Sequence, residues 1–267
     1  MIIRKSKVEL AKMAAAGMKV ARTLETVIAA VKPGMTTLDL DRLAEETIRR
    51  QGAVPSFKGY RGFPASLCTS INHEIVHGIP SASVTLREGD ILSIDCGAIV
   101  DGFHGDSAVT VVVGGEEVAP PNIRELVTTT HRALWAGIEQ VRVGNRLGDI
   151  GAAIERLAAE HGYGVVREYV GHGIGRALHE DPAVPNYGIA GRGLKLSQGW
   201  VLAVEPMFNR GGAETRTLED GWTVVTADGS PSVHWEHTIA VTNEGPWVLT
   251  AREEENSRPL TAEVVEG

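Results

Sequence analysis

The chain has 267 residues, of which 43% are hydrophobic and 22% are charged, an ordinary composition for a globular protein. Its formal net charge of -8 argues against direct binding of a nucleic-acid backbone. No apolar run is long enough for a signal peptide or a membrane span, and two cysteines, Cys68 and Cys96, make no disulfide framework. We therefore expect a cytoplasmic protein with reduced thiols.

The first half of the sequence predicts two helices followed by a pair of strands. Capping boxes at Ser6 and Thr36, each with an acidic residue three positions later, predict the helix starts. The helices end near residue 31, before a Pro-Gly pair, and at Gly52. Short strands and loops follow between residues 57 and 77. Strands at 91–96 and 106–113 are joined by a turn at 101–102.

The second half predicts the same order of elements. Asn122 with Glu125 starts a third helix, and a fourth covers residues 147–160 before Gly162. Strands are expected near 201–205, 222–226, 235–241 and 247–249. Residues 1–250 are expected to form a single domain, and residues 251–267 a polar, mobile tail.

The two halves also match residue by residue. A shift of 110 positions places Gly34 on Gly144 and Asp95 on Glu205. A shift of 130 positions places Asp106 on Glu236. Each half then offers two helices and two strands, with one carboxylate on each strand. This predicts one α+β domain of two similar halves, packed about a pseudo-twofold axis that gathers four carboxylates at the centre.

These four carboxylates predict a metal site. Asp95 and Glu205 end apolar runs, and Asp106 and Glu236 open them. One isolated acid of this kind could equally be a solvent-exposed strand end. Four acids gathered in a core repel one another, and these strands carry no matching Lys or Arg. A bound cation is the natural counter-charge.

Of nine histidines, three lie in glycine-rich loops: His77, His172 and His179. The glycines could make tight turns only, or could let substrate approach the backbone. Two His-Gly-Ile strings, expected at corresponding points of the two halves, favour a functional role. For the remaining histidines we expect local hydrogen bonding or packing; these are His73, His104, His131, His161, His234 and His237.

Four carboxylates and one imidazole suit two divalent ions of the Mn, Co, Fe or Zn type. Two such ions, about 3.5–4 Å apart, could bridge a hydroxide and stabilise a tetrahedral intermediate.

At Asp95, Asp106, His172, Glu205 and Glu236, in this order, the chain resembles methionine aminopeptidase of the short bacterial type I form. The strings that carry the resemblance are Ser70-Ile-Asn, His77-Gly-Ile-Pro, Asp101-Gly-Phe-His-Gly-Asp, Gly171-His-Gly-Ile-Gly, Glu205-Pro-Met and Glu236-His-Thr. The resemblance covers nearly the whole chain, from the first helix to about Leu249.

The resemblance implies a pita-bread fold and removal of the initiator methionine from nascent polypeptides whose second residue is small. By the family pattern, Asp95 chelates one metal ion, Asp106 and Glu236 bridge both ions, and His172 and Glu205 complete the other. Glu205 would also move the proton of the nucleophilic water. A monomer that meets nascent chains, with the ribosome as a second expected partner, fits this role.

The resemblance further implies how substrate binds. His179 would polarise the scissile carbonyl or stabilise the oxyanion, and His77 would contact the scissile amide nitrogen. The methionine pocket would be formed by Tyr60, Phe63, Cys68, His77 and Trp222, and with His179 these residues would make up the substrate-binding set. Asn72 and Ser232 match a site for a monovalent ion, Na or K. Leu178 and Phe57 depart from the residues common in the family, phenylalanine and cysteine respectively, and both border the pocket.

Three other functions compete with this interpretation. An Xaa-Pro aminopeptidase or prolidase would use the same fold, but normally with an additional amino-terminal domain. A non-catalytic pita-bread binding protein would have broken ligands, and all five are intact here. A two-metal phosphoesterase would need basic residues near the site, where only Arg176 lies close to a motif.

Overall fold

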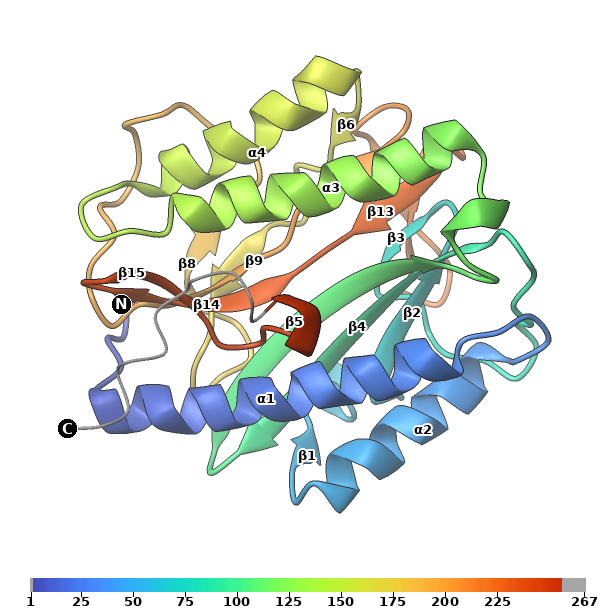
Figure 1. Cartoon of the computed structure of the whole chain (residues 1–267), viewed down its shortest axis with the longest axis horizontal. Helices are drawn as coiled ribbons and strands as arrows, with labels where there is room; N and C mark the ends of the chain where they lie inside the picture. The colour runs from blue at the N-terminus through green and yellow to red at the C-terminus, as the bar shows by residue number, and fades with distance from the viewer. Residues whose placement is uncertain (1, 256–267) are drawn as a thin grey trace.

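The computed structural model describes residues 2–255, in which two pairs of helices pack along a set of antiparallel strands (Figure 1). The helices are α1 (Lys7–Ala30), α2 (Thr37–Arg50), α3 (Pro121–Glu139) and α4 (Leu147–His161). Single 3-10 turns are η1 (Tyr60–Gly62), η2 (Glu116–Val118) and η3 (Glu253–Glu255). Within the described residues, no helix is long and apolar enough to cross a membrane.

Helix starts follow the sequence in three of the four cases. Ser6 and Thr36 form the expected capping boxes of α1 and α2. In α4, the Asp149 carboxylate accepts a hydrogen bond from the Arg146 backbone, at 2.7 Å. The box expected at Asn122 is wrong, because α3 begins one residue earlier, at Pro121. A proline suits the first helical position, since its φ is already helical and the backbone N–H that it lacks would have no partner there.

Each half contributes one antiparallel sheet. The first pairs β5-β4-β2, with β1 also on β4, and the second runs β15-β14-β9-β7-β8. Their strands are β1 (Val54–Pro55), β2 (Leu67–Ile71), β4 (Ile91–Val100), β5 (Phe103–Val112), β7 (Gly171–Gly173), β8 (Glu180–Val184), β9 (Val201–Val204), β14 (His237–Thr242) and β15 (Gly245–Val248). The pairing β5-β4-β2 therefore has its counterpart in β14-β9-β7.

Two small sheets complete the structure, ordered β13-β10-β6 and β11-β12-β3. Their strands are β3 (Glu74–Val76), β6 (Gly164–Val165), β10 (Met207–Asn209), β11 (Thr215–Thr217), β12 (Val224–Thr226) and β13 (Ser232–His234). All six are two or three residues long, too short for a clear periodic signal. Of these strands, β12 matches the strand expected near 222–226, and β3 lies in the stretch of short strands and loops expected between residues 57 and 77. Glu205 and Glu236 lie just outside β9 and β14 rather than on them.

Matching contacts confirm the two halves. The Gly34 N–H donates to the Leu86 carbonyl at 2.9 Å, and the Gly144 N–H donates to the Leu196 carbonyl at 3.2 Å. Both residues of the second contact lie 110 positions after those of the first. Isolated bridges Thr36–Thr85 and Arg146–Lys195 obey the same shift. In the view of Figure 1, α3 and α4 run across the upper part of the molecule and α1 and α2 across the lower part.

The two sheets meet where β5 runs antiparallel to the chain around β14. The Thr110 hydroxyl bonds to the His234 backbone, at 2.7 Å from its oxygen and 3.2 Å from its nitrogen. The Thr238 hydroxyl bonds to the Asp106 backbone in the same way, at 2.8 and 3.1 Å. These two sets of hydrogen bonds are equivalent under the pseudo-twofold axis. They therefore match each residue of β5 with the residue 128 positions later in the chain. The expected equivalence of Asp106 with Glu236 is therefore wrong, because Asp106 corresponds to His234.

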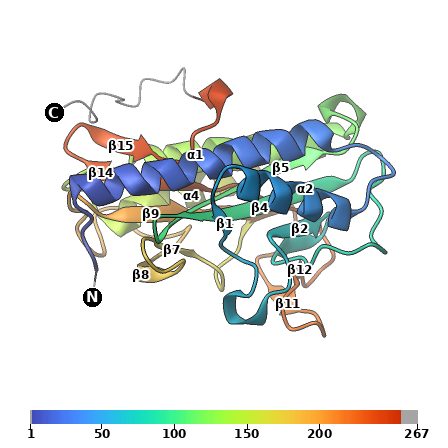
Figure 2. The ribbon, with the colours of Figure 1, turned by 90° about the horizontal axis from the view of Figure 1, so that it is seen from below.

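Helices cover one face of the sheets, and β7, β8, β11 and β12 lie toward the other (Figure 2). Beyond the expected domain end at residue 250, Arg252 and Glu255 are buried, so the chain packs at least as far as Glu255. The rest of the expected tail, 256–267, lies outside the described residues. Cys68 and Cys96 are buried and unpaired, as expected.

Candidate active site

A cavity of about 340 Å³ opens among the sheets and holds all of the residues proposed for metal binding and catalysis. It is lined by Phe57, Tyr60, Arg61, Phe63, Cys68, His77, Asp95, Asp106, His172, Leu178, His179, Glu205, Trp222 and Glu236. The six expected substrate-binding residues are among them, as are the two departures, Phe57 and Leu178. Arg61 alone was not anticipated. The sequence feature that could have indicated Arg61 is its position beside Tyr60, between Gly59 and Gly62. In the structure its φ is 49°.

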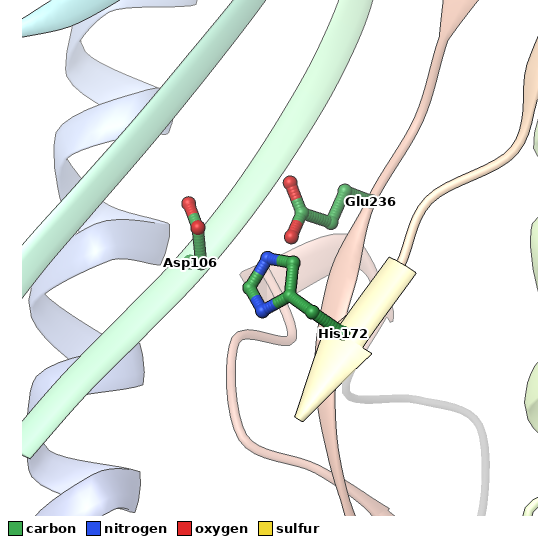
Figure 3. Close-up of side chains that lie close together, drawn as sticks. All are labelled: Asp106, His172 and Glu236. Atoms are coloured by element: carbon green, nitrogen blue, oxygen red, sulfur yellow. The ribbon is translucent and has the colours of Figure 1, made fainter. Parts of the chain in front are cut away.

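Asp106, His172 and Glu236 form the tightest group. One ligand atom of each lies within 4.8 Å of the others, and the three side chains converge in Figure 3. Asp106 comes from β5, His172 from β7, and Glu236 from the residue before β14. Residues 64 to 130 positions apart in the chain thus meet because β5 of the first sheet runs alongside the chain around β14 of the second.

Asp95 and Glu205 border this group. Glu205 Oε1 lies 3.6 Å from His172 Nε2, and Asp95 on β4 lies two register positions from Asp106 on the paired strand β5. Within this group of acids, three buried carboxylate oxygens have no hydrogen-bond partner among the described residues: Asp95 Oδ1, Asp106 Oδ1 and Glu236 Oε1. Buried carboxylate oxygens seldom lack partners, and oxygen-rich ligation is what divalent cations need. The residues therefore fit a divalent metal.

Burial raises the pKa of every one of these carboxyls. That of Asp95 rises to about 7, and those of Asp106, Glu205 and Glu236 lie well above their usual values, with repulsion between the acids adding to burial. A cation in the group would oppose both causes, since it favours the charged form.

His172 is prepared as a ligand. Its Nδ1 lies 2.9 Å from the Gly173 carbonyl, which fixes the proton on Nδ1 and leaves Nε2 for a metal. Burial lowers the pKa of His172 to about 3, so the imidazole is neutral at pH 7. A Cβ on Gly171 would lie 2.3 Å from the Ala203 carbonyl oxygen, and one on Gly173 would lie 2.1 Å from that of Asp181. Because these two glycines have no Cβ, the neighbouring backbone can approach them closely.

The two His-Gly-Ile strings do not correspond, contrary to expectation. His172 pairs with Ala203, whose equivalent at a shift of 110 is Ser93, and Ser93 pairs with Ser70. Ser70 of β2 therefore corresponds to His172 of β7, whereas His77 lies in the loop after β3.

His179 is held beside the metal ligands. Its ring centre lies 4.2 Å from that of His172, and its Nδ1 lies 2.8 Å from the Tyr60 hydroxyl. Burial lowers its pKa. If Tyr60 donates to Nδ1, the His179 Nε2–H is left to donate.

His77 lies on the apolar side of the cavity. Its ring meets Trp222 edge-on at 6.4 Å between centres, and Trp222 in turn meets Phe63 at 5.1 Å. Burial lowers the pKa of His77 to about 4. Its backbone has a φ of 62°, a conformation that costs free energy in a non-glycine residue and clusters at functional sites.

Asn72 and Ser232 lie together but outside the cavity lining. The Ser232 N–H donates to the Asn72 backbone carbonyl at 2.8 Å, and the Asn72 side-chain oxygen accepts from the Ile91 N–H at 2.9 Å. The monovalent ion there stays a prediction.

Next to Glu236 in the chain, His237 belongs to a buried polar cluster that the sequence analysis did not anticipate, since two of its members, Arg252 and Glu255, were expected in a mobile tail. The Glu255 Oε1 atom lies 3.2 Å from His237 Nε2, 2.5 Å from Arg252 Nη2 and 3.7 Å from His131 Nε2. Burial alone would raise the pKa of Glu255, but these partners hold it far below its usual range.

The model of metallopeptidase family M24 matches residues 11–243. A methionine aminopeptidase of Clostridium acetobutylicum is 52% identical over 252 residues, which is 94% of this chain and 99% of that protein. Methionine aminopeptidase 1 of Mycobacterium tuberculosis is 52% identical over 91% of this chain and 92% of its own length.

Among solved structures, a methionine aminopeptidase of Thermotoga maritima superposes with a TM-score of 0.92 at 43% identity, covering 94% of this chain and all of that one. A prolidase of Pyrococcus furiosus shares the fold, with a TM-score of 0.75 at 22% identity, but this chain covers only 66% of it. The fold is therefore the expected pita-bread fold. The chain belongs to metallopeptidase family M24 and, within it, to the methionine aminopeptidases.

Proposed function

We propose that this chain removes methionine from the amino terminus of polypeptides, as a divalent-metal peptidase acting through the cavity described above. The observation that carries the proposal is the convergence of Asp106, His172 and Glu236, with Asp95 and Glu205 beside them, at one end of a cavity whose remaining lining is largely aromatic and apolar. The family membership makes the chain a metal-dependent hydrolase.

For the cofactor, we propose two divalent ions of the Co, Mn, Fe or Zn type, held by Asp95, Asp106, His172, Glu205 and Glu236. Three unpartnered buried oxygens and a histidine with a free Nε2 support this donor set. Bound there, divalent ions supply Lewis-acid activation of water and of the peptide carbonyl.

The residues around the metal would handle protons and developing charge. Glu205, which lies 3.6 Å from His172 at the edge of the metal group, would accept the proton of the attacking water and pass it to the leaving amine. His179, held through Nδ1 by Tyr60, would donate from Nε2 to the carbonyl oxygen as negative charge develops there. His77 would hydrogen-bond to the scissile amide nitrogen.

The methionine side chain would lie against Phe63, Cys68 and Trp222, with Tyr60 and His77 at its edges. Cys68 is buried beside Asp95, and its pKa is raised well above its ordinary value by burial, so it would act as a neutral, apolar wall. An apolar cavity with a sulfur atom in its wall suits a flexible thioether. The limited volume supports the preference for a small second residue.

The test is release of methionine from a Met-Ala-Ser peptide with added Co or Mn. The acetylated peptide and a Met-Lys peptide should resist, and Glu205→Gln should be inactive. Asp41→Asn is the matched control, because Asp41 is a buried acid outside the cavity that accepts hydrogen bonds from the Ser66 and Leu67 N–H groups. It should retain activity. Absence of release with every metal would overturn the proposal.

A peptide with proline in second position separates the competing peptidase. Prolidase and Xaa-Pro aminopeptidase structures share only the fold with this chain, at 21–24% identity. Faster turnover of an Ala-Pro peptide than of Met-Ala-Ser would favour them. Action on nascent chains in the cytoplasm, near the ribosome and as a monomer, is proposed from the role in methionine removal.

A further inference from the structure

Glu205 lies between two imidazoles, one at each carboxylate oxygen. Oε1 is 3.6 Å from His172 Nε2, and Oε2 is 3.8 Å from His234 Nε2. His172 belongs to the metal group, whereas nothing in the proposed mechanism uses His234.

The His234 side chain is buried in the core, and one of its ring nitrogens has no hydrogen-bond partner among the described residues. It ends β13, only 2% of its side chain is exposed, and its Nε2 has no hydrogen-bond partner among the described residues. Its backbone is fixed on both sides by the Thr110 hydroxyl. A buried imidazole nitrogen without a partner is costly unless a nearby group uses it. The Glu205 carboxylate is the acidic group that Nε2 faces.

The symmetry of the fold gives an independent reason. His234 corresponds to Asp106 across the pseudo-twofold axis, and Glu205 corresponds to Asp95. Asp95 and Asp106 lie on the paired strands β4 and β5, two positions apart in the register, and both line the cavity. The equivalent two positions in the second half are occupied by His234 and Glu205. These side chains are therefore neighbours too, with an imidazole where the first half has the carboxyl of Asp106.

We propose that His234 is the positioning residue of Glu205, with its Nε2–H holding Oε2 so that Oε1 remains on the side of His172 and the metal group. The role of Glu205 itself rests on the proposed function. An N–H donor bound to one oxygen fixes the rotation of the carboxylate. One oxygen then accepts this hydrogen bond, and the other is left to face the metal group. Without the donor, Glu205 can rotate away from the attacking water or turn both oxygens to the metal.

Three variants test this in the metal-loaded enzyme. His234→Leu removes the donor, His234→Gln replaces it with an amide N–H at a similar reach, and Val233→Ala is the control. Val233 is fully buried in the same strand, and its truncation disturbs packing without touching the donor. We expect kcat to fall about 10- to 100-fold in His234→Leu, with KM changed less than about threefold, because outer partners of metal ligands have effects of this size.

His234→Gln should recover most of kcat, and Val233→Ala should lose stability but keep kcat. Calorimetry should show weaker binding of Mn to His234→Leu than to His234→Gln. Equal kcat in wild type and His234→Leu, or equal loss in His234→Leu and His234→Gln, would overturn the proposal.

A second measurement needs no catalysis. In metal-free protein labelled with ¹⁵N-histidine, His234 should carry its proton on Nε2, and Glu205→Gln should shift that resonance while Asp41→Asn should not. An unprotonated Nε2, or no response to Glu205→Gln, would overturn the proposal even if the variants are too unstable to assay. If wild type releases no methionine but the resonance responds, the positioning contact stands and the proposed function fails.

Discussion

Asp95→Asn should stabilise the metal-free protein at high pH and lose that advantage at low pH. The folded structure raises the pKa of Asp95 from 3.8 to about 7 by burial. In full, this corresponds to about 4 kcal/mol, at about 1.4 kcal/mol for each pH unit. Between pH 5 and pH 8, the contribution of Asp95 protonation to the free energy of unfolding changes by about 3 kcal/mol.

The sign follows from where the proton is held. Because the folded-state pKa is raised, folding favours protonated Asp95. The stability that this provides is complete below about pH 4 and is lost as pH rises through 7. Buried histidines with lowered pKa values, such as His172, have the opposite effect below about pH 6.5. They are present in both proteins, and so they cancel in the difference between wild type and variant.

The assay is urea unfolding of both proteins with a chelator, at pH 5 and at pH 8. The free energy of unfolding of Asp95→Asn, minus that of wild type, should rise by about 3 kcal/mol from the lower to the higher pH. A difference that does not change with pH, or that falls, would refute the argument that Asp95 is buried without a counter-charge in the metal-free state.

Metal should reverse the comparison. Saturating Mn stabilises only a protein that binds it, by an amount that grows with ligand concentration over Kd. Wild type should therefore gain more than Asp95→Asn at pH 8.

Three further variants probe the structure around the site. Gly173→Ala places a Cβ 2.1 Å from a backbone oxygen, and it should cost more than about 2 kcal/mol in urea unfolding while weakening metal binding by calorimetry. Tyr60→Phe removes the hydroxyl that holds His179, and it should lower kcat/KM about fivefold, the value of one neutral hydrogen bond. Glu255→Gln leaves His237 and its neighbours without their buried acid, and it should cost about 3 kcal/mol, measured by thermal unfolding.

For each of these three variants, one result would contradict the expectation. A Gly173→Ala protein as stable as wild type would mean that β7 and β8 can separate at no cost. An unchanged kcat/KM in Tyr60→Phe would show that the hydroxyl does not orient His179. Glu255→Gln with an unaltered midpoint would mean that the segment after residue 250 adds nothing to the stability of the domain.

The sequence alone determined which residues form the centre, because their chemistry is visible in one dimension. One acid at the end of an apolar run, such as Asp95 or Glu205, is ambiguous by itself, but four acids placed alike in two similar halves indicate a shared site. Helices α1, α2 and α4 were predictable for a similar reason, since caps and periodicity act within a few residues. The 110-residue repeat predicted that the acids of the two halves would meet.

Only the tertiary structure decided the register of the last strands and what lies behind the ligands. The 128-residue relation of β5 to β14 depends on hydrogen bonds of Thr110 and Thr238 across the axis, and no local pattern encodes them. His234 therefore looked like a flanking residue until its strand was placed. A side chain's partner across a fold is fixed by strand register, and a slip of two residues keeps every side chain on the same face while changing its neighbours.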